Sequence, residues 1–335
     1  INPNRAVEGS PAVDPANYNG DPDNFQPITR ANKAGTDWYD EIYRNALLQE
    51  YNLTLSGGTE KGTYAFTAGY LNEEGILIHT GFDRFSLRSN ADAKLNKWLS
   101  TGESLGLTYT QGKGNLSDNG EGTPISQAYR MQPIVPVYDI MGNFAGSKGN
   151  GTGNGENPVA VLWRDRNDLN SDLRGIGNVY IEATILKDLR AKSLFGFDYR
   201  SYNGRDIFMR NPEFTESKPA DNLTTSNNYT LQWNWANTLN YSKTLADVHK
   251  VNILVGSEAV SSTYRNFGAS RSTFFSTDIN YMFLDAGEAD QSNYGDGNDE
   301  RTMSYFGRIN YSFNDRYLFE GTLRRDGSSR FGANS

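Results

Sequence analysis

The chain has 335 residues, long enough for one large domain or two ordinary ones, and its composition excludes several classes of function. A net charge of −8 and an isoelectric point near 5.0 argue against a nucleic-acid partner, because a surface that binds phosphates is basic. Cysteine is absent and only two histidines occur, which removes thiolate chemistry and cysteine–histidine zinc sites. We therefore expect no cofactor and no metal ion.

The hydropathy of the chain argues against a membrane-spanning helix. Mean hydropathy is −0.67, and no stretch approaches the ~20 apolar residues that such a helix needs. A transmembrane β-barrel is compatible with this value, because only every second residue of its strands faces lipid. The 20 tyrosines, 17 phenylalanines and 5 tryptophans also suit a barrel, since aromatic residues gather at membrane interfaces, although soluble β-rich modules share this richness.

Residues 1–47 are expected to form an irregular lead-in with one short helix. Residues 1–35 are rich in Pro, Asn, Asp and Gly and have no hydrophobic period. The start has neither the charged nor the apolar region of a signal peptide, so we expect a cleaved leader or an excised segment. A helix capped by Thr36 is predicted next, with an apolar stripe of Trp38, Tyr39, Ile42, Tyr43, Ala46 and Leu47.

From residue 48 the hydrophobic period changes to two, which predicts a partial β-barrel over residues 48–335. In the clearest strand, 229–241, Trp233 and Trp235 share one face with four other apolar side chains, and the other face is polar or small. This strand exceeds the ~5–6 residues usual in soluble sheets and suits the ~9–11 that cross a bilayer. The same pattern predicts about ten antiparallel strands, the others lying near 51–56, 64–70, 83–94, 97–110, 174–187, 190–201, 248–261, 301–313 and 316–325.

The period of two also assigns the faces of these strands. We expect one set of side chains to face lipid, namely Tyr51, Phe66, Phe197, Trp233, Trp235 and Tyr311. A second set is expected to face the lumen, namely Asn52, Thr67, Gln232, Asn234 and Asn310.

The connections between the predicted strands alternate strictly in length. Short connections fall near 57–60, 95–96, 187–189, 242–247 and 314–315. Long connections lie between them, near 71–82, 111–172, 202–227 and 262–299. Outer-membrane barrels have short periplasmic turns at one rim and long extracellular loops at the other. Because the last residues read as a turn with no closing strand after it, we expect an all-β antiparallel segment of a larger transmembrane barrel.

Several phrases of the sequence resemble a known family, the SusC/RagA-like TonB-linked outer-membrane proteins. The resemblance covers residues 36–335, and the phrase at 323–332 is its most specific part. The phrases occur in the family's order: TDWYDEIYR at 36–44, QEYNLTLSGG at 49–58, GYLNEEGI at 69–76, FSLRSN at 85–90, NPVA at 157–160, SYFGRINY at 304–311 and LRRDGSSRFG at 323–332.

This resemblance implies a TonB-dependent importer of oligosaccharides or peptides in the outer membrane of a Gram-negative bacterium. It also implies a plugged barrel of ~22 strands, a SusD-like lipoprotein as a lid that captures substrate, and a TonB complex acting through an N-terminal region that these residues lack. Such a protein transports and makes no bond, so no catalytic residue is expected. The alternatives are a soluble or surface β-rich carbohydrate-binding module, a passive porin and, least favoured, a hydrolase.

The long loop 111–172 is the predicted place of substrate contact. Thr123 and Pro124 form a helix start within it. Aromatic faces with neighbouring arginines suit a glycan and suit a peptide equally, while packing of the loop on itself is the alternative. The candidate substrate-binding residues are Tyr129, Arg130, Tyr138, Phe144, Trp163 and Arg164.

Three other motifs favour ordinary surface roles. The glycine-rich run 142–155 lacks the spacing of a phosphate-binding loop and is interpreted as a loop tip. His79 and His249 have no second histidine nearby, so neither indicates a metal site. An acidic cluster of Asp296, Asp299 and Glu300 is predicted in a loop, and it lacks the spaced ligands of a calcium site.

Overall fold

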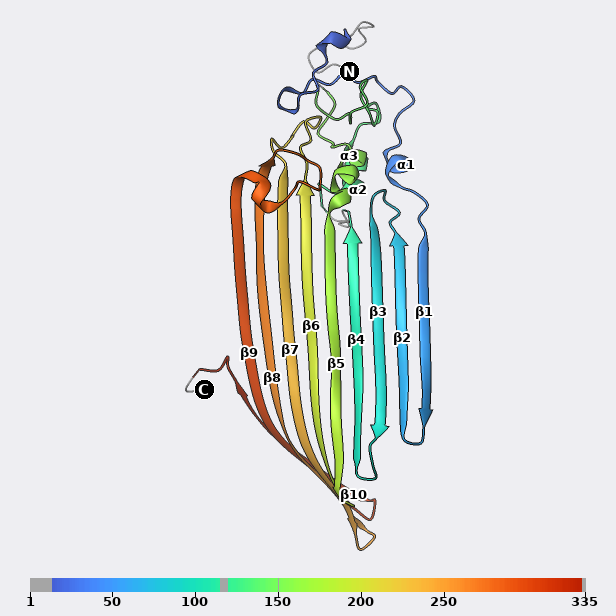
Figure 1. Cartoon of the computed structure of the whole chain (residues 1–335), viewed down its shortest axis with the longest axis vertical. Helices are drawn as coiled ribbons and strands as arrows, with labels where there is room; N and C mark the ends of the chain where they lie inside the picture. Colours follow the sequence, from blue (N-terminus) through green and yellow to red (C-terminus); the bar gives the residue numbers. More distant parts are fainter. Residues whose placement is uncertain (1–13, 115–119, 150, 333–335) are drawn as a thin grey trace.

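The computed structural model describes residues 14–114, 120–149 and 151–332, and its main element is one antiparallel sheet of ten strands (Figure 1). Each strand pairs with its neighbours in the sequence, and no pairing joins β1 to β10 within the described residues. The strands are β1 Leu48–Thr59, β2 Gly62–Glu74, β3 Gly81–Lys94, β4 Leu99–Lys113, β5 Leu169–Leu186, β6 Leu189–Phe208, β7 Asn222–Leu245, β8 His249–Phe274, β9 Gly287–Phe313 and β10 Tyr317–Ser328.

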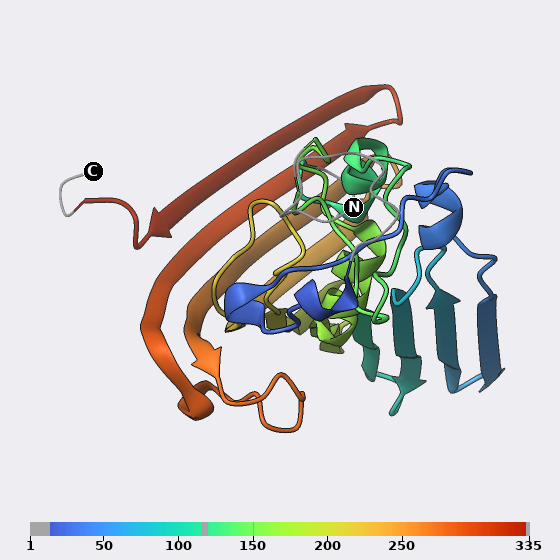
Figure 2. The same cartoon turned by 90° about the horizontal axis from the view of Figure 1, so that it is seen from above.

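Short helices and loops gather at one end of the sheet, opposite the tight turns (Figure 1). Seen from that end, the sheet bends round the part that carries α2 and α3 (Figure 2). The helices are α1 Trp38–Ile42, α2 Pro124–Arg130 and α3 Pro158–Arg164, with 3-10 turns η1 Pro15–Asn17, η2 Pro22–Asn24, η3 Asp165–Asn167 and η4 Leu284–Ala286. The predicted antiparallel sheet of about ten strands, with short turns at one rim and long loops at the other, is confirmed.

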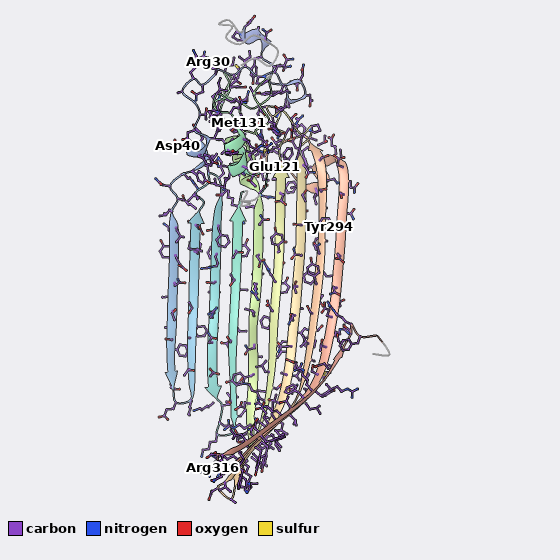
Figure 3. All side chains as sticks on the ribbon, turned by 180° about the vertical axis from the view of Figure 1, so that it is seen from behind. Arg30, Asp40, Glu121, Met131, Tyr294 and Arg316 are labelled. Atoms are coloured by element: carbon purple, nitrogen blue, oxygen red, sulfur yellow. The ribbon has the colours of Figure 1, made fainter. Side chains whose placement is uncertain are left out.

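Several strands are longer than predicted, so three predicted loops are wrong in their extent. Residues 71–82, 202–227 and 262–299 were expected as loops, but the actual connections cover only 75–80, 209–221 and 275–286. β9 alone has 27 residues, which is ~90 Å of strand against an apolar band of ~25 Å. In Figure 3, Tyr294 marks the upper part of β9 and Arg316 the turn at its far end. The strands thus continue beyond the apolar band, where no apolar alternation marks them in the sequence.

The acidic cluster Asp296, Asp299 and Glu300 lies in β9 and not in a loop, contrary to the prediction. Cross-strand pairing explains this placement. The guanidinium of Arg265 on β8 donates to both carboxylate oxygens of Asp299, at 3.1 and 2.7 Å. A polar pair of this kind stabilises a strand pair without any hydrophobic signal.

The register separates an apolar face from a polar face, because residues directly opposite on paired strands lie on the same face. One row of opposite residues runs Leu55, Phe66, Ser89, Leu105, Gly177, Phe197 and Trp233. The adjacent row runs Thr54, Thr67, Arg88, Gly106, Ile176, Asp198 and Gln232. The two sets predicted for lipid and for lumen therefore fall on opposite faces. We call the face of Trp233 the outward face, and its contact with lipid stays a prediction.

Helix α1 differs from the predicted helix at both ends. Asp37, not Thr36, is its N-cap, since its carboxylate accepts the N–H groups of Tyr39 and Asp40. The Thr36 hydroxyl instead donates to the carbonyl of Val135, at 2.8 Å. The helix ends at Ile42, before Ala46 and Leu47 of the predicted stripe, because a β-bridge between Tyr43 and Leu77 draws the chain into extended form.

The loop end has its own hydrophobic core. Trp38 and Ile42 of α1 are buried against residues of the long loop, such as Met131, Val135 and Leu162. The hydrophobic effect therefore holds the described part of the lead-in, residues 14–47, against the loop between β4 and β5. Among the described residues, no helix is both long enough and apolar enough to cross a membrane.

Candidate functional site

The connection between β4 and β5 spans 114–168 and carries both loop helices. Helix α2 begins at the predicted place, with the Thr123 hydroxyl accepting the N–H of Ser126 at 3.4 Å. Helix α3 was not predicted. Asn157 caps it by accepting two backbone N–H groups, and Pro158 occupies its first position. The Asn-Pro pair was a usable signal for this helix start.

Three of the candidate side chains come together in what we call the aromatic cluster, formed by Tyr138, Phe144 and Trp163. A β-bridge pairs Tyr138 with Phe144, and their ring centroids lie 5.5 Å apart in a stacked arrangement. The ring of Trp163 meets Phe144 edge-on, with centroids 5.7 Å apart. Tyr138 is 53% exposed and Trp163 39%, while Phe144 is half-buried between them. The cluster therefore offers two accessible aromatic side chains on one supporting ring.

Arg166 covers part of this cluster and was not among the predicted residues. Its guanidinium carbon lies 3.5 Å from the centroid of the Trp163 ring, and it also donates to the Trp163 carbonyl. A guanidinium over an indole face is a favourable cation–π contact. One face of the Trp163 indole is therefore occupied, and only the rest of the ring is available to a substrate.

Arg164 lies beneath the cluster. Its guanidinium carbon is 5.6 Å from the Phe144 centroid, and its nitrogens donate to both carboxylate oxygens of Glu213, at 2.7 and 2.9 Å. Arg164 and Glu213 are 8% and 2% exposed, so their pairing is a buried, bidentate ion pair that joins two loops. Arg164 thus positions the cluster, with its donors engaged inside the protein.

A second carboxyl group lies beside this pair. Glu156 is 3.9 Å from the Arg164 guanidinium and accepts a hydrogen bond from the Asn211 amide. Burial raises the pKa of the Glu156 carboxyl above its ordinary value, while Asn211 and Arg164 act in the opposite direction. The connection between β6 and β7, which carries Asn211 and Glu213, is therefore bound to the long loop through polar contacts.

The two remaining candidates lie apart from the cluster. Tyr129 on α2 is 82% exposed, and no ring contact joins it to the cluster among the described residues. Arg130 is directed to Glu121, with its guanidinium 3.9 Å from the carboxylate and 3.4 Å from the carbonyl of that residue. Glu121 precedes α2 and Met131 follows it, and in Figure 3 Glu121 lies nearer the sheet than Met131.

The base of the long loop holds a perturbed carboxyl group at Asp168. Burial raises the pKa of Asp168 to about 7, and the N–H of Ile207 opposes this by donating to the carboxylate at 2.7 Å. Asp165 and Asp206 add to the increase. Asp168 therefore changes charge near neutral pH.

The remaining sequence motifs form no site among the described residues. His79 lies between β2 and β3 with a positive φ of 64°, and His249 Nδ1 is 2.7 Å from the Tyr311 hydroxyl. No group of three or more His, Cys, Asp or Glu residues that could hold a metal occurs in the described ranges. Residue 150 of the glycine-rich run lies outside those ranges.

No protein-family model matches the chain. Curated relatives do: TonB-dependent receptor P3 of Formosa agariphila is 27% identical over 317 residues, covering 90% of this chain and 30% of the relative. TonB-dependent receptor SusC of Bacteroides thetaiotaomicron is 28% identical over 330 residues, covering 89% of this chain and 31% of SusC. The chain thus spans about 30% of the length of these relatives.

Among solved structures, the chain is similar in fold to the RagAB peptide importer in its closed-closed state. The TM-score is 0.74 at 22% identity, covering 92% of this chain and 35% of that chain. The predicted fold, an open antiparallel sheet that forms a segment of a larger barrel, is thereby confirmed. By sequence and by fold, the resemblance predicted from the sequence is confirmed: this chain is a barrel segment similar to the SusC/RagA-like TonB-dependent receptors.

Proposed function

We propose that this chain forms part of an outer-membrane importer that depends on TonB and takes up oligosaccharides or peptides. In this proposal residues 1–47 lead into a barrel wall of 48–335, and a SusD-like lipoprotein closes the mouth as a lid. Two comparisons support this proposal: the matched relatives are TonB-dependent receptors, and the fold of this chain is similar to part of a peptide importer. The loop end of the sheet is the side from which substrate arrives, because long loops lie at the extracellular rim of such barrels.

The observation that carries the substrate role is the aromatic cluster. Two exposed rings, Tyr138 and Trp163, share a half-buried ring, and the buried pair of Arg164 with Glu213 stabilises the loop beneath them. Rigid aromatic side chains contribute large contact area at little entropic cost, as sites for sugar rings or apolar peptide side chains require. The cluster lies in the loops round which the sheet bends (Figure 2), where substrate or lid would contact it.

The test is to change Trp163→Ala and Tyr138→Ala in the whole receptor and to measure substrate uptake and lid association in cells. Truncation of an aromatic contact of this kind costs over ~1 kcal/mol of binding, so we expect roughly tenfold weaker affinity. Phe275→Ala is the matched control, because Phe275 is a 94% exposed aromatic on the different loop between β8 and β9. Wild-type uptake and lid binding in both cluster variants would contradict the proposed role.

The passive porin is the competing function within the same fold. Loops gathered at one end of the sheet are common to both kinds of barrel (Figure 1), so dependence on TonB distinguishes them. Uptake that ceases when TonB is deleted supports the importer. Uptake that continues at the same rate without TonB supports the porin.

A further inference from the structure

Arg166 is a half-buried arginine that forms no ion pair with any of the described residues. A guanidinium has five N–H donors, and the one hydrogen bond that Arg166 makes within the described chain goes to the Trp163 carbonyl. Arginine is rarely buried unless it is paired, and carboxylates are abundant in this chain, whose net charge is −8. The remaining donors of Arg166 therefore point to an anionic partner outside the described residues.

No carboxylate in the part of the chain that the structure describes offsets the charge of Arg166. Burial lowers the pKa of its guanidinium, and no acidic group acts in the opposite direction. Asp165, the neighbour in sequence, acts on other groups: burial raises the pKa of Glu156 and of Asp168, and the charge of Asp165 raises both further. The positive charge of Arg166 is thus available to a ligand.

Other cations lie near Arg166. The turn that carries His79 lies against the start of the long loop, since a Cβ atom built on Gly114 would be 2.6 Å from the His79 carbonyl oxygen. Partial burial lowers the pKa of His79, and three neighbouring charges lower it further, those of Arg166, Arg44 and Lys113. A carboxylate lies 3.9 Å from Arg44, and within the described ranges none lies at ion-pair distance from Lys113. This side of the loop base therefore favours an anion.

We propose that Arg166 binds a carboxylate of the imported substrate while the aromatic cluster contacts the neighbouring ring or side chain of the same molecule. This inference rests on the proposed function and narrows it to anionic chains, either acidic peptides or oligosaccharides of uronic acids. The planar guanidinium matches the two oxygens of a carboxylate. Its carbon lies 3.5 Å from the Trp163 centroid, so its free donors lie beside the cluster. Because stacking on the indole already holds the guanidinium in place, little further entropy is lost on binding.

The experiment measures how well the whole receptor, purified in detergent and immobilised, retains ligands that carry carboxylates. Two probe mixtures are used, a tryptic digest of casein and oligogalacturonides, each before and after methyl esterification of its carboxyl groups. Bound molecules are quantified by mass spectrometry. We expect the wild type to retain the free-acid form of one mixture roughly tenfold better than its ester, as a hydrogen-bonded charge pair provides. The mixture that is retained identifies the source of the carboxylate.

Variants at position 166 separate the charge from the packing of the loop. Arg166→Gln should abolish the preference for the free acid and leave retention of the esters close to that of the wild type. Arg166→Lys keeps the charge but loses the planar fork, so it should retain part of the preference. The matched control is Arg30→Gln, which removes the charge of an exposed arginine at the loop end of the molecule (Figure 3) and should leave the preference unchanged. Heat-modifiable gel migration reports folding for each variant.

Several outcomes would overturn the proposal. Equal retention of the free and esterified forms by the wild type, or retention of neither, is one such outcome. An unchanged preference in folded Arg166→Gln is another, and so is a loss in Arg166→Lys as large as in Arg166→Gln. If Arg166→Gln weakens lid association while the preference persists, the guanidinium binds the lid and not the substrate. Ester retention that falls in Trp163→Ala would still support the proposed function, so the two ideas can fail separately.

Discussion

The buried ion pair between Arg164 and Glu213 makes a quantitative prediction about the loop end. The side chains of Glu213 and Arg164 are 3% and 10% exposed, and two hydrogen bonds of 2.7 and 2.9 Å join them. Removing one partner of such a pair leaves a buried charge without compensation, which costs about 3–5 kcal/mol. Glu156, at 3.9 Å from the guanidinium, compensates only in part. We expect Glu213→Ala to destabilise the packing of the long loop on the connection between β6 and β7.

Hydrogen exchange of the whole receptor measures this effect directly. At 1.4 kcal/mol for each factor of ten, the loss corresponds to roughly a hundred- to several-thousand-fold faster exchange in the segments near Arg164 and Glu213. The control is Asp299→Ala, which breaks the equally short but exposed pair with Arg265 and should leave the exchange of the loop segments unchanged. The double variant Arg164→Met and Glu213→Leu replaces both charges by apolar side chains, so it should recover most of the lost stability. Exchange in Glu213→Ala that matches the wild type would refute this reasoning.

Two further changes test the same loop. Because the pKa of Asp168 is raised to about 7 from an ordinary value of 3.8, the folded loop holds a proton that the unfolded loop has lost, and stability falls as pH rises from about 4 to 7. Proteolysis of the loop should therefore be faster at pH 8 than at pH 5, and Asp168→Asn should reduce that difference, part of which comes from Glu156; an unchanged difference would contradict the assignment. Asn157→Ala removes the cap of α3 and the two hydrogen bonds that the Asn157 amide donates to the carbonyls of Val137 and Ala145, at 2.9 and 2.8 Å. It should therefore lower the stability of the loop in thermal unfolding by ~2 kcal/mol or more. A smaller loss than in Thr123→Ala, which removes only the cap of α2, would argue against this role of Asn157.

The barrel wall could be predicted from sequence because its signal is local. In strand 229–241 each residue reports its face through its own polarity, and the tight turns fix the register of the next strand. The same reasoning fails where strands leave the apolar band. There Arg265 and Asp299 stabilise the pairing, and polar residues in a strand look like polar residues in a loop.

The candidate site was harder to predict, because its contacts join segments far apart in the chain. Tyr138, Phe144 and Trp163 were among the predicted residues, and the structure brings them together. The partner of Arg164 was not predictable, since Glu213 lies on another connection and 40 acidic residues were available. Arg166 was missed although it follows Trp163 by three residues, because only the fold of α3 and η3 brings the guanidinium over the indole.

The most direct test of the account is whether the face of Trp233 and Trp235 meets lipid in the assembled receptor. This chain contains no cysteine, so a single introduced thiol is unique within it and can carry a spin label. Labels at Trp233→Cys and Trp235→Cys are expected to be accessible to oxygen and shielded from a polar nickel complex, whereas labels at Gln232→Cys and Asn234→Cys should show the reverse preference, since neighbouring residues of a strand face opposite ways. Shielding of the tryptophan positions from both reagents, or greater access of nickel there than at Gln232 and Asn234, would contradict the assignment of this sheet to a transmembrane barrel wall.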